Sequence, residues 1–299
     1  MADLILKANG LSFSAIDRGE GPVVLLLHGF PDTHHTWQYQ IEALVAAGYR
    51  CIAPVMRGYE ASSQVSDGNY TIDSIASDVA GWLDHLGVEK AHLVGHDWGA
   101  VMSYAAACKY PERFYSLTTL AIPHMVTYSK ALSRLPIQYL NSSYMLFFQL
   151  RGLADWVVRR NDFGFLKFLW RRWSPGWDWP ESVFDDVRQT FSQPGVVKAS
   201  LGYYRSMFSR AHKQTSASSS GVISVPTLAM TGVKDGCMDT RVFEGMENSS
   251  RFTAEVRVES VQNAGHFLQL EQPERVNELL LSWLNKHQPE QQIDELITA

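Results

Sequence analysis

Hydrophobic and polar positions in the first third of the chain follow two alternating periods. Short apolar runs typical of strands occupy residues 11–16, 23–27 and 50–55. Between the runs at 23–27 and 50–55, residues 36–46 have the spacing of a helix. The same spacing occurs at residues 71–87, where apolar side chains recur every three or four positions. The apolar positions of this second helix are Ile72, Ile75, Val79, Leu83 and Leu86. The pattern therefore predicts strands and helices in alternation.

The same alternation continues along the chain and returns near its C-terminus. Residues 91–96 and 114–122 form apolar runs, and a predicted helix with many small residues separates them. The later predicted elements are a strand at residues 227–230, a short helix near 241–247, a β-rich segment at 253–261 and a helix at 273–286. Strands that alternate with helices indicate an α/β fold with a mostly parallel sheet and helices on both faces. In such sheets the chemistry collects at the carboxyl ends of the strands.

Residues 124–221 interrupt this alternation. The segment is helix-like throughout and rich in aromatic residues and arginine, and it closes with a serine-containing connector at residues 216–221. A helical insertion at this point would cover the carboxyl edge of the sheet as a lid. We therefore predict a core domain of residues 1–123 and 222–299 and a helical cap domain of residues 124–221. Aromatic residues interleaved with arginines in a lid more often form its core and a solvated basic face than a membrane-binding surface.

Composition limits the expected partners and cofactors. Of the 299 residues, 45% are hydrophobic and 19% are charged, and the formal net charge is -5, which argues against a nucleic-acid surface. Cys51, Cys108 and Cys237 lack the spacing of a disulfide framework or a zinc site, so we expect no metal and no cofactor. No stretch resembles a signal peptide or approaches the roughly 18 apolar residues of a membrane span. We expect a cytoplasmic protein, and the sequence leaves monomer and homodimer open.

The segment Gly95-His96-Asp97-Trp98-Gly99 places a carboxylate where the α/β-hydrolase pattern G-x-S-x-G has its serine. It lies between a predicted strand and a predicted helix, and small residues on either side permit a sharp turn that exposes the central side chain. Aspartate is ordinarily ionised near neutral pH, so unlike serine it needs no base before it attacks. A carboxylate nucleophile suits displacement at an alkyl carbon, which forms an ester. The alternative is that Asp97 only caps the following helix.

An ester on Asp97 must be hydrolysed, which requires a base that activates water. His266 lies in a glycine-containing loop before the last helix, and Asp235 follows the strand predicted to end near residue 230. The order of nucleophile, acid and histidine along the chain is the order expected for this architecture. Either residue alone has a structural interpretation, as a loop histidine or a turn-forming aspartate. Together with Asp97 they predict a catalytic triad, with Asp239 as the second candidate for the acid.

Attack on the carboxyl carbon also requires hydrogen-bond donors for the negative charge that develops there. His28-Gly29-Phe30-Pro31 follows the apolar run at residues 23–27, so we expect the backbone N–H groups of Phe30 and Trp98 to form an oxyanion hole. A tight Gly-Pro turn is a structural interpretation that is compatible with this role. The histidines that we interpret as structural are His28, His34, His35, His92, His96 and His124.

Taken together, these motifs resemble those of the α/β-hydrolase epoxide hydrolases. The matching segments are His28-Gly29-Phe30-Pro31-Asp32, Met56-Arg57-Gly58-Tyr59, Gly95-His96-Asp97-Trp98-Gly99, Asp235 and Gly265-His266-Phe267. The resemblance runs over nearly the whole chain. It implies the α/β-hydrolase fold with a helical cap, and the opening of a small apolar epoxide to a vicinal diol through an ester on Asp97.

The resemblance also implies two cap tyrosines that donate hydrogen bonds to the epoxide oxygen. Tyr144 matches the first of these motifs, and Tyr204 matches the second, with Tyr203 in the neighbouring register. A buried aromatic residue is the structural alternative for each of them. The sequence departs from the family pattern at Leu150-Arg151, where an acidic-proline pair is more usual.

A further departure lies in the loop that follows the third predicted strand. Val55 and Glu60 stand where relatives commonly have aspartate and glycine. Neither position is catalytic in the family. The departure concerns the local loop conformation, since glycine is often present for its backbone freedom.

Two other functions stay open at the level of sequence. A dehalogenase would use the same aspartate and histidine with halide donors in place of tyrosines, and Trp98 fits one half of such a site. Two positions argue against a dehalogenase. Phe30 stands where haloalkane dehalogenases have an asparagine in common, and Trp98 stands where fluoroacetate-type enzymes have arginine. A ligand receptor without catalysis is the third possibility, but it would need none of the retained catalytic groups. Epoxide hydrolysis is therefore the leading hypothesis.

Overall fold

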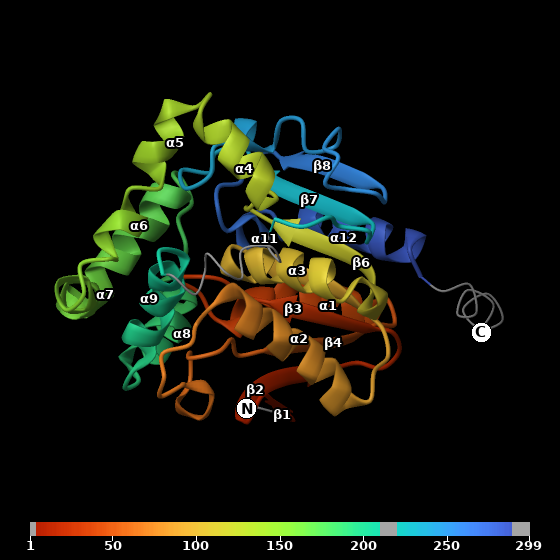
Figure 1. Cartoon of the computed structure of the whole chain (residues 1–299), viewed down its shortest axis with the longest axis horizontal. Coiled ribbons are helices and arrows are strands. Elements are labelled where there is room, and N and C mark those ends of the chain that lie inside the picture. The colour runs from red at the N-terminus through yellow and green to blue at the C-terminus, as the bar shows by residue number, and fades with distance from the viewer. Residues whose placement is uncertain (1–3, 210–219, 289–299) are drawn as a thin grey trace.

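The computed structural model describes residues 4–209 and 220–288. Within them the strands form one eight-stranded sheet in the order β1-β2-β4-β3-β5-β6-β7-β8 (Figure 1). The β1/β2 and β2/β4 pairs are antiparallel, and the other pairs are parallel. The strands are β1 (Leu4–Ala8), β2 (Leu11–Arg18), β3 (Val23–Leu27), β4 (Arg50–Pro54), β5 (Ala91–His96), β6 (Phe114–Leu120), β7 (Thr227–Gly232) and β8 (Val256–Val261). The prediction of a mostly parallel sheet is confirmed.

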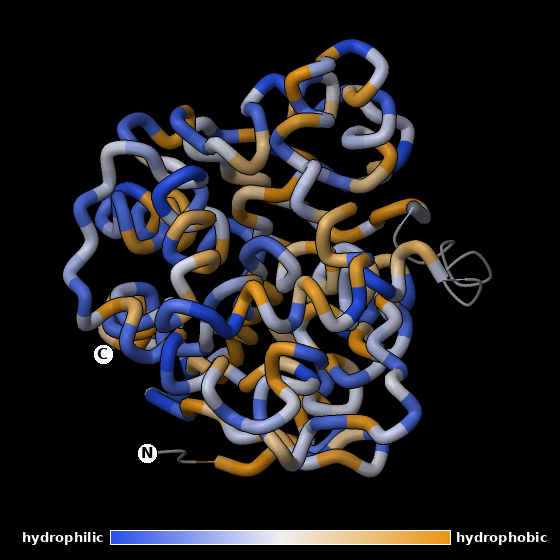
Figure 2. The backbone as a smooth tube through the Cα atoms, turned by 90° about the vertical axis from the view of Figure 1, so that its left-hand side faces the viewer, coloured by the Kyte–Doolittle hydropathy of each residue, from blue (hydrophilic) through white to orange (hydrophobic). Residues whose placement is uncertain are grey.

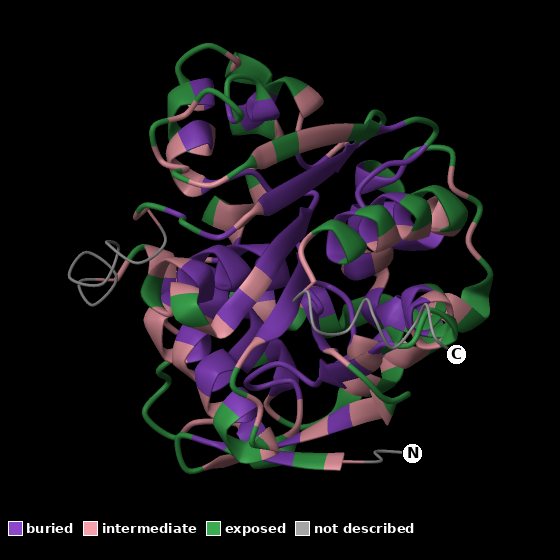
Figure 3. Cartoon of the chain, turned by 90° about the vertical axis from the view of Figure 1, so that its right-hand side faces the viewer, coloured by how far each residue is buried: buried purple, intermediate pink, exposed green. Residues whose placement is uncertain are grey.

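Helices cover both faces of this sheet, because successive side chains of a strand point to opposite faces. On β3, Leu25 and Leu27 join one hydrophobic cluster and Val24 and Leu26 join the other. The helices of the core are α1 (Gln38–Ala46), α2 (Ile72–Leu86), α3 (Trp98–Lys109), α11 (Leu268–Glu271) and α12 (Pro273–Lys286). α2 and α3 share the first cluster, and α1 and α12 share the second. Burial on both sides makes the central strands the most enclosed part of the molecule (Figure 3).

The ends of α2 show how local sequence sets the bounds of a helix. The Thr71 side chain accepts a hydrogen bond from the Ser74 N–H, which satisfies a donor of the first turn. At the other end, Gly87 adopts a left-handed φ of 65°, which ends the helix. Both ends agree with the prediction of a helix at residues 71–87, and α12 likewise has the predicted bounds.

Three details of the sequence analysis need correction. β1 was not predicted, because it is a short edge strand in which only Leu6 and Ala8 are buried. The helix expected near residues 241–247 is a single 3-10 turn at Thr240–Phe243. The apolar segments around Cys51 and Cys108 predict that both are buried, but only Cys51 is buried and Cys108 is partly buried. The other 3-10 helices are η1 (His34–Trp37), η2 (Ala61–Ser63) and η3 (Pro111–Arg113).

Between β6 and β7 the described chain is helical, as the sequence predicts. The helices are α4 (Met125–Leu132), α5 (Pro136–Asn141), α6 (Tyr144–Phe147), α7 (Leu153–Trp173), α8 (Glu181–Ser192) and α9 (Val196–Met207). Figure 1 shows α5 to α9 grouped on the left, beyond the end of the sheet. The division into domains at residues 124 and 221 stays a prediction, and residues 216–219 of the expected connector lie outside the described residues. No helix in the described parts of the chain is long and apolar enough to cross a lipid bilayer.

Side chains and backbone of α7 tie this helical part to the core. The Trp170 indole Nε1 donates a hydrogen bond to the Pro31 carbonyl at 2.9 Å. The Trp173 carbonyl accepts hydrogen bonds from the N–H groups of Gly236 at 2.9 Å and His266 at 3.1 Å. These bonds join α7 to the loops that follow β3, β7 and β8, where the candidate site lies.

Candidate active site

Asp97 occupies the sharp turn between β5 and α3. Its backbone has φ 50° and ψ -117°, a conformation that residues other than glycine rarely adopt. A Cβ atom on Gly95 would collide with the Gly99 carbonyl, and a Cβ atom on Gly99 would collide with the Leu27 carbonyl, which explains the flanking glycines. The Asp97 side chain makes no cap hydrogen bond to α3. Asp97 is the N-cap residue of α3 by position, but its side chain does not cap the helix.

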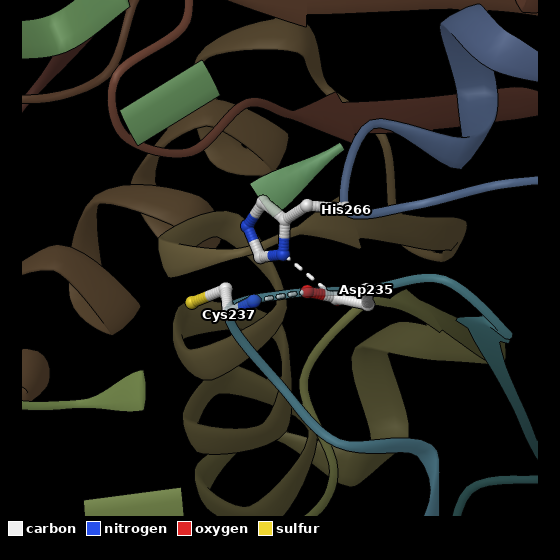
Figure 4. A group of neighbouring side chains, drawn as sticks. All are labelled: Asp235, Cys237 and His266. Carbon is white, nitrogen blue, oxygen red and sulfur yellow. Dashed lines mark hydrogen bonds and ion pairs between the residues drawn. The ribbon is translucent and has the colours of Figure 1, made fainter. Parts of the chain in front are cut away.

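The structure brings Asp97, Asp235 and His266 together in the interior. His266 Nδ1 donates a hydrogen bond to Asp235 Oδ2 at 2.9 Å (Figure 4). On the other side of the ring, Nε2 lies 3.5 Å from Asp97 Oδ2. The second oxygen of Asp235 accepts hydrogen bonds from the N–H groups of Cys237 at 2.7 Å and Met238 at 2.9 Å. These two bonds hold the Asp235 carboxylate in place, and this carboxylate in turn orients the imidazole.

Two neighbouring candidates point elsewhere. Asp239 caps the 3-10 turn η4, and both of its carboxylate oxygens bond to the Arg241 guanidinium. The Tyr203 hydroxyl donates a hydrogen bond to the Arg57 carbonyl at 2.7 Å. Both side chains are thus bonded to groups other than Asp97. The structure therefore favours Asp235 over Asp239 as the acid and Tyr204 over Tyr203 as the cap tyrosine.

One of the two expected backbone donors contacts the Asp97 carboxylate directly. The Phe30 N–H donates to Asp97 Oδ1 at 2.7 Å. Gly29 permits this approach, because a Cβ atom there would collide with the Asp97 side chain. The Trp98 N–H lies in the first turn of α3, where amide groups lack an intrahelical partner. Within the described ranges the Asp97 side chain receives no bond from it.

Tyr144 on α6 and Tyr204 on α9 line the same pocket as Asp97. Their ring centroids are 5.7 Å apart. The Tyr204 hydroxyl is buried and has no hydrogen-bond partner in residues 4–209 and 220–288, whereas the Tyr144 hydroxyl lies 3.6 Å from Cys237 Sγ. Burial raises the pKa of both hydroxyls well above the usual value, and the charge of Asp97 raises it further. Both groups therefore stay protonated at neutral pH and are available as donors.

The pocket itself is small and mostly apolar. Its volume is about 60 Å³, which is below the roughly 300–1,000 Å³ of pockets for drug-sized ligands. Its remaining lining residues are Trp98, Val101, Ile122, Met125, Tyr128, Ser142, Met145, Met207 and Met238. Such a lining suits a compact apolar molecule whose polar end meets the carboxylate and the tyrosines.

The charges around His266 decide its protonation. Burial opposes a charge on the ring, but Asp235 and Asp97 outweigh burial and raise the pKa of His266 to about 10. The ring therefore rests as an imidazolium between two carboxylates. Because each carboxylate contributes, loss of either charge would lower this pKa.

Two further buried histidines support the site as neutral rings. Burial lowers the pKa of His96 to about 3 and that of His28 to about 4. His96 Nε2 donates to the His266 carbonyl at 2.9 Å, and His28 Nε2 accepts from the Met56 N–H at 3.1 Å. Both residues thus hold backbone segments of the site, in agreement with their interpretation as structural.

Cys237 and Trp173 lie against residues of the site, although the sequence analysis did not assign them to it. Cys237 follows Asp235 by two residues, and that proximity is a signal that could have found it. The Trp173 ring centroid lies 5.0 Å from those of both His266 and Tyr144, and its buried Nε1 has no partner among the described residues. No sequence signal distinguishes Trp173 from the other tryptophans around it.

Asp235, Cys237 and His266 also offer potential metal ligands within 4.8 Å of one another (Figure 4). Oxygen, sulfur and nitrogen atoms of this kind can ligate zinc. Here, however, the facing atoms of Asp235 and His266 bond to each other. Burial also raises the pKa of the Cys237 thiol well above its usual value, so that it keeps its proton. The arrangement fits a carboxylate-histidine pair better than a metal centre, and the expectation of no metal stays a prediction.

Comparison with known proteins agrees with this fold. A family model described as alpha/beta hydrolase fold matches residues 22–273. Epoxide hydrolase 4 of Homo sapiens is 32% identical over 293 residues, which cover 94% of this chain and 78% of that protein. The AB hydrolase superfamily protein YfhM of Bacillus subtilis (strain 168) is 32% identical over 283 residues, which cover 93% of this chain and 96% of that protein.

Solved structures give the same result. The crystal structure of an epoxide hydrolase from Bacillus megaterium in complex with an inhibitor matches with a TM-score of 0.80 and 26% identity, and the match covers 94% of this chain and 100% of that one. The chain belongs to the α/β-hydrolase fold family, and within it to the epoxide hydrolases, as its motifs indicated. The predicted fold class and the prediction of a hydrolase are thereby confirmed.

Proposed function

We propose that the protein opens a small apolar epoxide to a vicinal diol through a covalent ester on Asp97. The observation that carries this proposal is the position of the Asp97 carboxylate, which lies in one pocket with two protonated tyrosines and 3.5 Å from His266. Relatives that are named epoxide hydrolases supply the class of substrate. The lining of methionine, valine and aromatic side chains supports an apolar epoxide.

In the first step, an Asp97 oxygen attacks a ring carbon and the bond from that carbon to the ring oxygen breaks. Tyr204 and Tyr144 donate hydrogen bonds to the ring oxygen, and one of them transfers its proton to it, which yields the hydroxyl group of the ester. The resulting phenolate is reprotonated by way of solvent at the expense of the His266 imidazolium. This transfer becomes favourable because the ester removes the Asp97 charge that helped to raise the pKa of His266.

In the second step, neutral His266 removes a proton from water, and the water oxygen attacks the carboxyl carbon of Asp97. Nε2 is the ring atom available for this role, since Nδ1 is held by Asp235 and Nε2 has no hydrogen-bond partner within the described chain. The Phe30 N–H, and by prediction the Trp98 N–H, stabilise the tetrahedral oxyanion. The bond to the alkyl oxygen then breaks, the diol leaves with a proton from His266, and the carboxyl proton returns to the imidazole.

The same proposal gives residues 124–221 the role of a cap domain over a core of residues 1–123 and 222–299. This assignment is supported by the origin of the pocket walls. Tyr144 and Tyr204 come from helices of the inserted segment, whereas Asp97 and Trp98 come from the core. The cap would thus supply the acid groups and the core would supply the nucleophile and the base.

A single turnover in heavy-oxygen water tests the ester. With enzyme in excess over a styrene-type or aliphatic epoxide, the first diol should carry no heavy oxygen, because its new oxygen comes from Asp97. The label should appear in the Asp97 carboxylate instead. Heavy oxygen in the first-turnover diol would contradict the covalent mechanism.

Two comparisons separate the alternatives. The buried Trp173 N–H without a partner favours dehalogenation as the second candidate, so halide release from haloalkanes is measured beside diol formation. Halide release without diol formation would reverse the order of these two functions. For the receptor hypothesis, Asp97→Ala should abolish turnover under either enzymatic function, whereas an epoxide that binds wild type and persists unconverted would support a receptor.

A further inference from the structure

The outer side of α5, α6 and the first half of α7 exposes a series of large apolar side chains. These side chains form what we call the cap ridge: Tyr139, Leu140, Leu146, Leu150, Leu153 and Trp156. Leu140 is 62% exposed, Leu146 64% and Trp156 54%. Figure 2 looks onto this side of the molecule, where hydrophobic and hydrophilic positions are interleaved along the chain. Single exposed apolar residues are ordinary, but a series from one short stretch marks an interaction surface.

The ridge is the outer face of helices whose inner face is packed. On α7, Ala154 and Val158 are buried while Leu153 and Trp156 point outward, and the Arg160 guanidinium lies 4.3 Å from the Trp156 ring centroid. On α6, the neighbours of exposed Leu146 include Tyr144 and Met145, which line the catalytic pocket. The same short helix therefore separates the pocket from the ridge.

The charged residues in the stretch of chain that carries the ridge are almost all positive. From residue 114 to residue 160 the sequence contains one carboxylate, Asp155, and that carboxylate is engaged by Arg205. The cations of the same stretch are Lys130, Arg134, Arg151, Arg159 and Arg160, all of them exposed. This accumulation stands out in a chain with a formal net charge of -5.

A groove of about 1110 Å³ adjoins the ridge and continues the positive surface. Trp156 and Arg151 line it from the ridge, and Arg159 and Lys198 add further cations. Its opposite wall is the loop at residues 64–71, which contributes a single carboxylate, Asp67. The groove therefore offers room and charge for anionic headgroups beside an apolar edge.

We propose that the cap ridge and its arginines form a docking surface for anionic lipid bilayers. Apolar and aromatic side chains that enter the boundary of the acyl region, together with cations that meet anionic headgroups, are the usual basis of interfacial binding. Long arginine side chains suit this position, because their stems lie along apolar surface while the guanidinium groups reach the headgroups. Buried Trp170 and Trp173 thus belong to the core of the lid, as the sequence analysis expected of such aromatic residues. Exposed Trp156 instead belongs to the proposed docking surface.

Charge argues against a second copy of this chain as the occupant. In a two-fold symmetric contact the same patch meets itself, so the arginines of both copies would lie against one another. An anionic bilayer has the complementary charge and the apolar interior that the ridge requires. Docking in this orientation would place α6, which contributes Tyr144 and Met145 to the pocket wall, next to the lipid phase.

Vesicle co-sedimentation of the full chain tests the proposal. Binding is measured on vesicles of phosphatidylcholine alone and on vesicles that also contain phosphatidylserine, at low and high salt. We expect binding to the anionic vesicles that weakens with salt. The variants Leu153→Ser/Trp156→Ser and Arg159→Glu/Arg160→Glu should each lower the partition coefficient by about tenfold or more.

The matched control places the same kinds of change on the exposed side of β1. Ile5→Ser/Lys7→Glu replaces one exposed apolar residue and one exposed cation away from the ridge, and it should bind like wild type. Thermal unfolding and diol formation from dissolved substrate should be unchanged in all variants, which separates loss of docking from misfolding.

Equal binding to neutral and anionic vesicles, or unaltered binding of the ridge variants, would overturn the proposal. If the protein sediments in the absence of vesicles and the ridge variants abolish this sedimentation, the ridge is instead a self-association surface. The docking does not depend on the proposed catalytic function, since vesicle binding is measured without substrate. A protein that forms no diol but binds these vesicles would contradict the catalytic proposal alone.

Discussion

At the scale of single residues, the site is a balance of charges around one imidazole. Asp235 is held by two backbone N–H groups, and Asp97 by one. His266 lies between them and carries a proton in the resting protein because its pKa is raised to about 10. In the proposed mechanism, esterification of Asp97 would remove one of the two charges and so convert the imidazolium into the base that the second step requires.

This raised pKa predicts how stability depends on pH. The folded-state value of about 10 lies above the ordinary 6.5, so protonation of His266 stabilises the folded protein fully below pH 6.5. The contribution is lost as the pH rises through about 10. The free energy of unfolding of wild type relative to His266→Gln, measured with urea over this range, should therefore decrease with pH. A constant difference would show that His266 is not held as an imidazolium.

The two pocket tyrosines should act as partly redundant acids. Tyr144→Phe/Tyr204→Phe should lower kcat for diol formation by about 10²–10⁴, the usual contribution of general acid catalysis. Each single replacement should have a smaller effect, because one donor remains. Tyr203→Phe is the control, since its hydroxyl bonds to the Arg57 carbonyl outside the pocket. A double variant with wild-type kcat would remove the tyrosines from the mechanism.

At the scale of elements, the turn from β5 to α3 depends on close approach of backbone. Gly99→Ala would place a methyl group against the Leu27 carbonyl, and such overpacking should destabilise the protein by about 1–3 kcal/mol. Gly164→Ala is the matched control, because a Cβ atom there has its nearest neighbour at 3.4 Å. It should be neutral or slightly stabilising, since alanine favours helix. Urea unfolding of both variants checks the difference, and equal stabilities would contradict it.

Element bounds were predictable where a strong local signal marks both ends. α2 has a threonine cap and a terminal glycine, and its apolar positions repeat at helical spacing. β1 gave no such signal, because an edge strand of five residues buries only two of them. The choice between Tyr203 and Tyr204 was undetermined for another reason. Neighbouring residues of a helix point about 100° apart, and the packing of α9 on the core decides which of them enters the pocket.

At the scale of the whole molecule, the helical part and the core share one interior. Trp170 is fully buried, donates to the Pro31 carbonyl, and its ring centroid lies 4.4 Å from that of Phe267. Trp170→Ala would leave a cavity and an unpaired carbonyl, at a cost of about 3–5 kcal/mol. We still expect a single unfolding transition by circular dichroism and by tryptophan fluorescence. Exposed Trp156→Ala should change stability by less than about 0.5 kcal/mol, and two separate transitions would contradict the shared interior.

Sequence alone was enough to predict the turn that presents Asp97, the order of acid and histidine along the chain, and the alternation that builds a parallel sheet. These features are local, since each depends on residues that are neighbours along the chain or on a short repeating pattern. Packing in three dimensions was needed to show that Asp235 rather than Asp239 meets His266, that Tyr204 rather than Tyr203 faces Asp97, and that Cys237 lies against Tyr144. These contacts join residues far apart in the sequence, so they follow from packing that spacing does not encode. The same holds for the surface, because only the fold shows that Trp170 is interior and Trp156 is not.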